Sequence, residues 1–339
     1  MPNFGPLDQL SMTEIVRLQN LLQQELTRRF ERRMLLLFSD IVGSTPYFAR
    51  FGDAAGYQMQ RLHFDVLEQG TSGFDGRIVD TAGDGAFLVF AEAQAALRGV
   101  VAVQRLVSDA NLARAHAHQL RLRMGMHWGP VLTDGAAVSG DSVNLCARVA
   151  GSAAVGEVRL TREVFQELSS VARMQCHALG AVELKGVAGP VELLLLDWRD
   201  RSRFPTRLRV EETQQLIELP LLDIITFGRL HEHEGMPAND VVLAHPDPQF
   251  ARHISRWHFE LRRGAEGFCL RGLSDALTEV NGEPAPKGHD MPIKPGDRIR
   301  LAEVLTLVAV QAPSGDADDE SATMLRPHSR PAPFSGSTH

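Results

Sequence analysis

The sequence predicts an α+β domain followed by a smaller all-β sandwich, and three observations support this fold class. The chain has 339 residues, a length that favours two domains. Apolar runs of strand length alternate with helical patterns until about residue 198. Beyond residue 216 the runs are short and separated by Gly, Pro and Asn-Gly turns. We therefore predict an N-terminal helix in 1–33, the α+β domain in 34–198, a linker in 199–215, the sandwich in 216–311 and a disordered tail in 312–339.

Charge, cysteine content and hydropathy narrow the class of protein. The formal net charge is -7, whereas a general nucleic-acid binder is more often basic, so we expect no nucleic-acid partner. The cysteines Cys146, Cys176 and Cys269 are far apart in the sequence, which fits reduced thiols better than disulfides or a zinc site. No apolar run approaches the roughly 20 residues of a membrane helix, and the N-terminus lacks a secretory pattern. These features predict a cytoplasmic protein without a membrane span.

The first expected element is a helix over residues 8–33. Its apolar side chains recur every three to five residues, with Gln, Glu and Arg between them. So narrow a stripe suits pairing with a second helix. Packing of the helix on its own domain is the alternative, and the sequence leaves both open. The stripe consists of Leu10, Ile15, Leu18, Leu22, Leu26 and Phe30.

Strands and helices then alternate through the α+β domain. Residues 34–38 form a short continuous apolar run, as expected of a buried central strand. Two later runs, 77–81 and 86–90, are joined by a turn with an Asp-Gly pair, which predicts a tight hairpin. The remaining expected elements are helices at 91–112 and 141–150, a strand at 120–126, and two closing strands within 182–197.

Two carboxylates stand where a divalent cation could bind. Asp40 closes the first strand and is followed by a Gly-Ser-Thr turn at 43–45, whose main-chain N–H groups suit phosphate oxygens. Asp84 lies at the tip of the hairpin. If the hairpin pairs with the first strand, the two carboxylates face one another and repel unless a cation lies between them. Such a pair suits two-metal phosphoryl transfer.

Three further side chains could act on a phosphate. Asn144 and Arg148 are four residues apart on an expected helix, so they share one face. An amide and a guanidinium on one face can stabilise an oxygen whose charge grows during reaction. Lys185, on an expected short strand before a Gly turn, could contact phosphates as a point charge.

In order and in kind, these residues resemble the class III adenylate and guanylate cyclase catalytic domain over about residues 32–197. The matching stretches are Phe-Ser-Asp-Ile-Val-Gly-Ser-Thr at 38–45, Gly-Asp-Gly at 83–85, Val-Asn-x-x-x-Arg at 143–148 and Leu-Lys-Gly at 184–186. The resemblance implies a ferredoxin-like sheet with helices and a head-to-tail homodimer with two active sites at its interface. Each site would convert a nucleoside triphosphate into its cyclic monophosphate and pyrophosphate, with two Mg²⁺ or Mn²⁺ ions.

The resemblance also implies a role for each residue. One subunit would hold the metal ions through Asp40, Ile41 and Asp84. The other would supply Asn144 and Arg148 to the transition state. The residues expected to bind the phosphates are Gly43, Ser44, Thr45 and Lys185.

The two base-selecting positions depart from the adenylate cyclase pattern. Asp80 replaces the usual Lys, and Ala137 replaces an Asp or Thr. An ionised Asp80 cannot donate to adenine but can accept from the N–H groups of guanine, and Asp with a small Ala approximates the guanylate cyclase pattern. Adenylate cyclase, the commoner bacterial activity, is the leading expectation. A guanylate cyclase, a loosely selective enzyme and a pyrimidine substrate are the alternatives.

The β-sandwich carries a second set of residues suited to a phosphate. Arg229 follows an apolar strand, and Ser255 and Arg256 begin the stretch Ser-Arg-Trp-His. Guanidinium groups and a hydroxyl can together bind a phosphate dianion, while His258 is expected to brace the loop through a hydrogen bond. With Gly-Asp-x-Ile at 296–299, this set resembles the forkhead-associated (FHA) domain. The resemblance implies that Arg229, Ser255 and Arg256 bind a phosphothreonine of a partner protein.

One departure and one rival interpretation accompany these resemblances. Ala276 stands where the FHA family has an Asn that holds the peptide backbone, and Asp275 adds negative charge nearby. The domain could therefore bind phosphopeptides weakly or dock proteins without phosphate.

The alternative to an enzyme is a silent adaptor, in which the cyclase fold only dimerises or senses nucleotide while the sandwich binds a partner.

Overall fold

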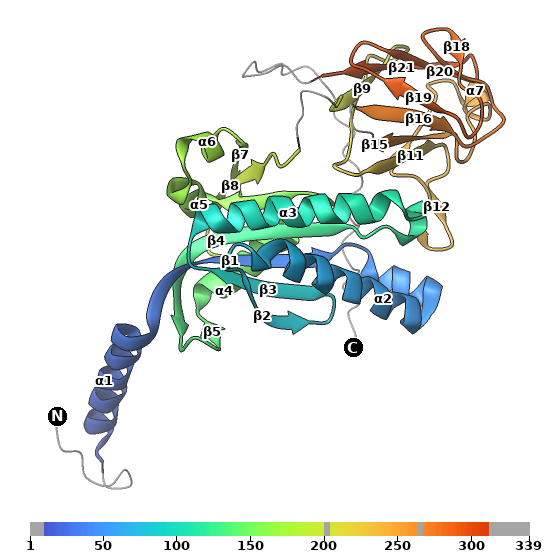
Figure 1. Cartoon of the computed structure of the whole chain (residues 1–339). Coiled ribbons are helices and arrows are strands. Elements are labelled where there is room, and N and C mark those ends of the chain that lie inside the picture. Colours follow the sequence, from blue (N-terminus) through green and yellow to red (C-terminus); the bar gives the residue numbers. More distant parts are fainter. Residues whose placement is uncertain (1–9, 200–203, 264–266, 312–339) are drawn as a thin grey trace, which may run out of the picture. The chain divides into compact units, whose positions relative to one another are not determined.

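The computed structural model describes residues 10–199, 204–263 and 267–311. Contacts between residues divide the chain into two compact units, coloured along the sequence in Figure 1. The first unit contains residues 1–42, 60–106 and 122–196, and the second contains residues 43–59, 107–121 and 197–339. The predicted tail 312–339 lies outside the described residues.

An eight-stranded sheet forms the framework of the first unit. Seven strands follow the order β2-β3-β1-β4-β6-β8-β7, and β5 pairs with β4. Leu35, Leu36 and Leu37 of β1 are fully buried, which confirms the buried strand predicted from their apolar run. The predicted hairpin forms as β2 and β3, and β3 pairs with β1. The strands are β1 Glu31–Ile41, β2 Arg77–Ala82, β3 Gly85–Phe90, β4 Leu122–Thr133, β5 Val138–Ser139, β6 Val158–Thr161, β7 Cys176–Val182 and β8 Val191–Leu196.

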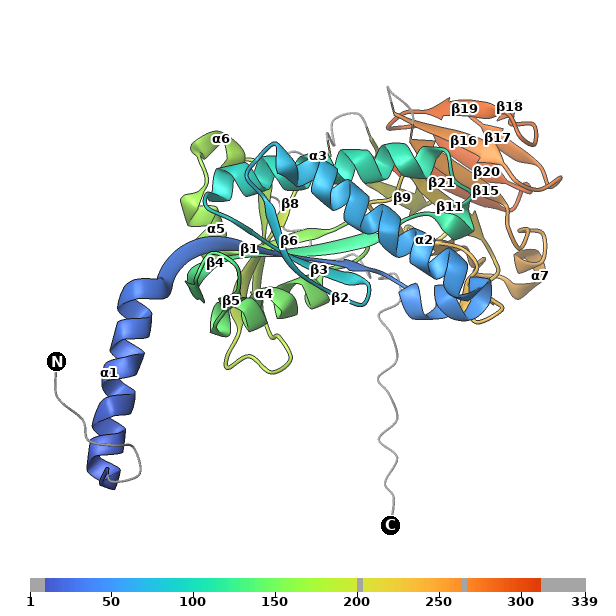
Figure 2. The same ribbon diagram turned by 60° about the horizontal axis from the view of Figure 1, so that its bottom comes forward.

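Helices cover both faces of this sheet. Helix α4 packs against β1 and β4, on the face opposite α3 (Figure 2). Alternate side chains of a strand point to opposite faces of the sheet. Leu36 of β1 points to the face covered by α4, where it packs with Cys146 in one buried cluster. Helix α2 loses helical geometry at Gly52, where φ is 78°. The helices are α1 Met12–Phe30, α2 Ser44–Ser72, α3 Ala93–Leu112, the 3₁₀ turn η2 His116–His118, α4 Asp141–Ser152, α5 Arg162–Glu167 and α6 Ser170–Arg173.

Helix α1 ends, and β1 begins, earlier than the sequence predicted. Ser11 and Glu14 form a reciprocal capping box at the start of α1. Glu31 adopts extended geometry and pairs with Leu132 of β4, so the strand begins there. None of the residues of α1 is buried in the single chain. Its apolar stripe is therefore left exposed.

Residues 204–311 of the second unit, here called the β-domain, form two sheets and a hairpin, as expected of an all-β segment. The six-stranded sheet has the order β10-β9-β21-β20-β17-β18, the five-stranded sheet has the order β14-β11-β15-β16-β19, and β12 pairs with β13. Within the described part of the β-domain, the only helix is α7, Pro248–Ala251. The strands are β9 Arg207–Val210, β10 Leu216–Glu218, β11 Ile224–Gly228, β12 Glu232–His233, β13 Met236–Pro237, β14 Val241–Val242, β15 Phe259–Arg263, β16 Phe268–Gly272, β17 Thr278–Val280, β18 Glu283–Pro284, β19 Asp290–Ile293, β20 Arg298–Leu301 and β21 Leu305–Val310.

Strand β9 lies inside the range 199–215 that the sequence predicted as a linker. Leu208 and Val210 are buried, while the arginines between and before them are partly exposed. This alternation is that of a strand with one solvated face, and its charged half made the stretch resemble a linker. Among the described helices, none is long and apolar enough to cross a bilayer.

Candidate active site

A cavity of about 650 Å³ in the first unit gathers several of the residues singled out in the sequence. Asp40 of β1 and Asp80 of β2 line it, and Ala137, just before β5, lines it as well. Asp40 and Asp80 are the ionisable side chains of its wall. The apolar part of the wall includes Phe38, Val79, Phe87, Val138 and Val143.

Strand pairing brings the two predicted metal carboxylates to the same end of the sheet. Asp40 pairs with Gly85 across β1 and β3, so Asp84 directly precedes the partner of Asp40. Gly83, with φ of 61°, turns the chain between β2 and β3. Ile41 follows Asp40, and its side chain is buried, so its carbonyl is the group that could serve a metal ion.

This ligand set fits a magnesium-like ion. Within the residues that the structure describes, no group of three or more His, Cys, Asp and Glu could hold a metal. Mg²⁺ is commonly held by one or two carboxylates, and substrate phosphates and water complete its coordination. Asp40 and Asp84, with the carbonyl of Ile41, match that pattern.

Arg123 of β4 is a site residue that the motif analysis missed. It is the cross-strand partner of Asp40, and its Nε donates to Asp40 Oδ2 at 2.8 Å. Its Nη1 also donates to the carbonyl of Gly151, a cavity residue, at 3.3 Å. A guanidinium at this point offsets the charge of the carboxylate. Only the register of β1 against β4 reveals the pair, because its members are 83 positions apart in the sequence.

The rim beside Ala137 is held by four hydrogen bonds. Asp134 Oδ1 accepts from the N–H groups of Ala136 and Ala137, both at 2.9 Å. Arg77 donates to the Ala136 carbonyl at 2.9 Å, and Thr133 Oγ1 donates to the Ala137 carbonyl at 2.7 Å. The two N–H bonds hold the pKa of Asp134 below its ordinary value. These bonds occupy the N–H and carbonyl groups of both alanines. The groups that the two alanines can still offer to the cavity are therefore their methyl side chains.

Helix α4 presents two different faces. Val143, Ala147 and Ala150 line the cavity, whereas Asn144 and Arg148 are exposed and are absent from its wall. The four-residue spacing on α4 places Asn144 and Arg148 on one shared face. The structure therefore does not bring this amide and this guanidinium into the wall of the cavity of the same chain.

Lys185 lies in a turn, which corrects the strand predicted there. It falls between β7 and β8, where the N–H of Val187 donates to the Leu184 carbonyl at 3.1 Å. Gly186 has φ of 78°, a conformation that breaks extended geometry and suits glycine. Lys185 is exposed on this turn.

The predicted phosphate turn belongs to the second unit. Gly43 has φ of 80°, and Ser44 begins α2. The N–H of Tyr47 donates to the Gly43 carbonyl at 3.1 Å, as in a first helical turn. The leading N–H groups of a helix, here near Ser44 and Thr45, have no intrahelical acceptor and suit phosphate oxygens.

A buried histidine adjoins both segments that carry the metal carboxylates. His63 of α2 has no exposed surface, and its Nε2 lies 2.7 Å from Ser39 Oγ. Its Nδ1 has no hydrogen-bond partner among the described residues, and the main chain of Asp84 lies beside the ring. Burial lowers the pKa of His63 to about 4, and the main chain and charge of Asp84 oppose this only in part.

The second predicted site lies in loops of the β-domain. The N–H of Arg229 donates to the Ser255 carbonyl at 3.0 Å, so the two loops are adjacent. The N–H of Ser255 donates to His258 Nδ1 at 3.0 Å, which confirms the predicted bracing by His258. Arg229 and Arg256 are exposed. Asp275 pairs with Lys287 at 3.3 Å, which offsets part of its negative charge.

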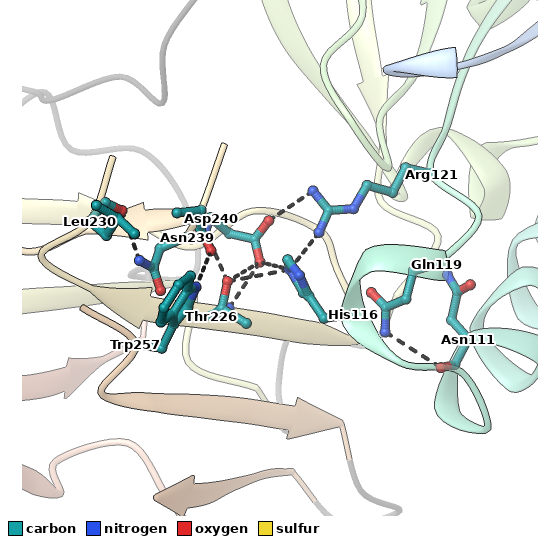
Figure 3. A network of polar contacts seen from close by, with 10 residues as sticks. Asn111, His116, Gln119, Arg121, Thr226, Leu230, Asn239, Asp240 and Trp257 are labelled. Atoms are coloured by element: carbon teal, nitrogen blue, oxygen red, sulfur yellow. Dashed lines mark hydrogen bonds and ion pairs between the residues drawn. The ribbon is translucent and has the colours of Figure 1, made fainter. Parts of the chain in front are cut away.

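Asn239 and Asp240 connect these loops to another part of the second unit (Figure 3). Asn239 Nδ2 donates to the carbonyls of Leu230 and Arg256, both at 2.8 Å. The buried Asp240 carboxylate lies 2.9 Å from Arg121 Nη1 and 2.7 Å from His116 Nε2.

The pKa of Asp240 is set by opposing effects. Burial by itself would raise the pKa, but Arg121, His116 and the N–H of Thr226 together hold it below its ordinary value. The Thr226 N–H and Oγ1 donate to Oδ2 at 2.9 and 3.0 Å. Asp240 is thus a fully partnered, ionised group inside the second unit.

Comparison with known proteins gives matches to nucleotide cyclases over part of the chain. Residues 29–197 match the model of the Adenylate and Guanylate cyclase catalytic domain. A protein named "Putative adenylate cyclase 3" from Rhizobium meliloti is 24% identical over 199 residues, which are 59% of this chain and 34% of that protein. The chain thus spans about a third of the length of that curated relative.

Solved structures of cyclases also match. An adenylate/guanylate cyclase/hydrolase from Silicibacter pomeroyi is 22% identical, with a TM-score of 0.45, over 49% of this chain and 96% of that chain. An adenylate cyclase from Trypanosoma brucei in its monomeric state is 21% identical, with a TM-score of 0.42, over 49% of this chain and 90% of that chain.

The matched segment contains each of the cyclase motifs recognised in the sequence, from Phe38 to Gly186. It also contains the whole cavity wall with Asp40, Asp80 and Ala137. Residues 29–197 therefore belong to the adenylate and guanylate cyclase catalytic domain family, and the chain carries the catalytic domain of a nucleotide cyclase.

Proposed function

We propose that the chain cyclises a nucleoside triphosphate, ATP being the leading candidate, at sites shared by two copies of the chain. The observation that carries the proposal is the division of the motif residues. Asp40 lines the cavity with the base-selecting positions, whereas Asn144 and Arg148 of α4 are exposed and do not belong to its wall. A head-to-tail homodimer would bring the exposed face of one α4 to the cavity of the other chain.

In this proposal each residue acts on a stated part of the substrate. Asp40, Asp84 and the Ile41 carbonyl would hold two Mg²⁺ or Mn²⁺ ions, which when bound would lower the pKa of the ribose 3′-hydroxyl and neutralise the departing pyrophosphate. Asn144 and Arg148 of the second chain would donate to the α-phosphate oxygens as their charge grows. The turn at Gly43–Thr45 and Lys185 would bind the outer phosphates.

The proposal leaves open which nucleotide base the site selects. Asp80 is the one ionisable group beside Asp40 on the cavity wall, and the rim at Ala136 and Ala137 offers methyl groups. The Asp80 carboxylate accepts hydrogen bonds, and no Lys, Arg or His is among the described residues that line the cavity. Such a site favours a base with N–H groups at its edge, and guanine has more of these groups than adenine. GTP and a relaxed specificity are therefore the alternatives to ATP.

Product analysis tests the proposal. Purified full-length protein is incubated with Mn²⁺ and each of ATP, GTP, CTP and UTP, and cyclic nucleotides are quantified by mass spectrometry. We expect one or two cyclic monophosphates to form, with Asp84→Ala abolishing the product. A well-folded, dimeric protein that makes no cyclic nucleotide from any of the four would instead support the silent adaptor.

For the β-domain we propose binding of a phosphothreonine segment of a partner protein through an FHA-like site. The adjacency of Arg229 and Ser255, the exposure of Arg256 and the bracing by His258 support it. Phosphothreonine peptide arrays probed with the full chain should show binding that Arg229→Ala removes. Equal binding of unphosphorylated peptides would indicate phosphate-independent docking, in keeping with Ala276.

A further inference from the structure

We propose that His63 is a positioning residue that fixes the Asp40 and Asp84 segments relative to each other, so that affinity for the catalytic metal ions depends on it. The proposal rests on the proposed cyclase function. It assigns a task to a buried ring that adjoins both segments in the described structure.

The first contact is with the Asp40 segment. Ser39 directly precedes Asp40 in β1, and alternate side chains of a strand point to opposite faces. Both residues contribute to the cavity wall, but Ser39 is fully buried and its Oγ lies 2.7 Å from His63 Nε2. The ring therefore holds the strand from the side opposite to the metal carboxylate.

The second contact is with the Asp84 segment. The main chain of Asp84 lies beside the ring, and the buried Nδ1 has no hydrogen-bond partner in the described chain. A neutral imidazole accepts at one nitrogen and donates at the other. If Ser39 donates to Nε2, the proton resides on Nδ1 and faces the Asp84 carbonyl.

His63 thus spans two segments whose side chains would share the ions. Groups one step behind a metal ligand fix its orientation, and their loss typically costs about 10- to 100-fold in metal affinity or activity. A histidine that only filled space would leave metal affinity unchanged when replaced by an apolar side chain of similar size. The two cases therefore differ in a measurable quantity.

The experiment measures binding of Mn²⁺ alone to the full chain by electron paramagnetic resonance, together with the Mn²⁺ dependence of cyclisation. We expect His63→Leu to weaken Mn²⁺ binding about 10-fold or more. His63→Asn, which keeps a donor near the Nδ1 position, should recover part of the affinity. His63→Gln, which keeps only a group near Nε2, should recover less.

The matched control is His127 of β4, a second buried histidine of the first unit. Its Nδ1 lies 3.0 Å from Thr161 Oγ1, and it contacts neither Asp40 nor Asp84 in the described hydrogen-bond network. His127→Leu should therefore leave Mn²⁺ affinity unchanged even if it lowers stability.

The outcomes separate the two hypotheses. Folded His63 variants that bind Mn²⁺ as the wild type does would overturn the positioning role while leaving the proposed cyclase intact. A weakening that is equal in the Asn, Gln and Leu variants and in the His127 control would also overturn it, because the effect would then be general destabilisation. Wild-type protein that neither binds Mn²⁺ nor forms a cyclic nucleotide would refute the proposed function itself.

Discussion

Asp240 shows how one buried charge can stabilise the second unit. Its carboxylate interacts with the side chains of Arg121 and His116 and accepts a hydrogen bond from the N–H of Thr226. Together these interactions outweigh the effect of burial and lower the pKa of Asp240. A group whose pKa is lower in the folded state stabilises the fold above its unfolded pKa, about 3.9 for Asp. This stabilisation disappears as the pH falls through the folded-state pKa.

Asp240→Asn tests this at the residue scale. We expect it to reduce the free energy of unfolding at pH 7 by about 3–5 kcal/mol, because Arg121 is left without its buried partner. The difference from the wild type should shrink progressively below about pH 4, because the Asp240 carboxylate of the unfolded wild type takes up a proton there while that of the folded protein stays ionised. Urea unfolding followed by circular dichroism between pH 3 and pH 7 measures both effects. A difference that is independent of pH would contradict the ionised state of Asp240.

At the scale of elements, the rim 133–137 shows a loop whose main chain is held by its own side chains and by Arg77 of β2. Asp134 accepts two N–H groups, and Arg77 and Thr133 hold the two carbonyls. The loop therefore places Ala137 at a fixed point of the cavity. A base bound there would meet a rigid wall, which is the condition for discrimination between bases by shape.

Loosening that loop should weaken discrimination. We expect Asp134→Ala to reduce the ratio of kcat/KM between the best and second-best nucleotide by roughly three- to tenfold, since two hydrogen bonds that order the loop are lost. Steady-state assays with each nucleotide measure the ratio. Asp134→Asn keeps an acceptor oxygen and should remain near the wild type. An equal loss in both variants would point to the charge of Asp134 instead of its hydrogen bonds.

At the scale of the whole molecule, the proposed active site needs two chains. Asp84→Ala and Arg148→Ala remove groups that belong to opposite chains of one site. Each variant alone should be inactive. Their mixture should recover up to about a quarter of the wild-type rate, because about half of the dimers would be mixed and each would keep one intact site of two.

Product formation by mixed and unmixed preparations measures this recovery. Two preparations of Asp84→Ala, mixed in the same way, provide the control. Light scattering verifies that each variant is dimeric. If exchange of subunits is demonstrated and no activity returns, the shared site is excluded.

How much the sequence predicted depended on how local each feature is. The buried run at Leu35–Leu37, the hairpin around Asp84 and the all-β character of the C-terminal segment follow from patterns within a few residues, and the structure confirms them. Lys185 was misplaced because a positive φ at Gly186 overrides the apparent strand. Strand β9 was missed because its charged, solvated half concealed the alternation.

The cyclase motifs, their order and the kind of chemistry they suit can be read from the sequence alone, because each motif is a short run of residue types. Which of these residues come together depends on the fold. Strand register pairs Asp40 with Arg123 and with Gly85, the residue after Asp84, and burial brings His63 to Ser39. These are contacts between residues distant in the chain, which packing and hydrogen-bond register fix and local sequence does not encode.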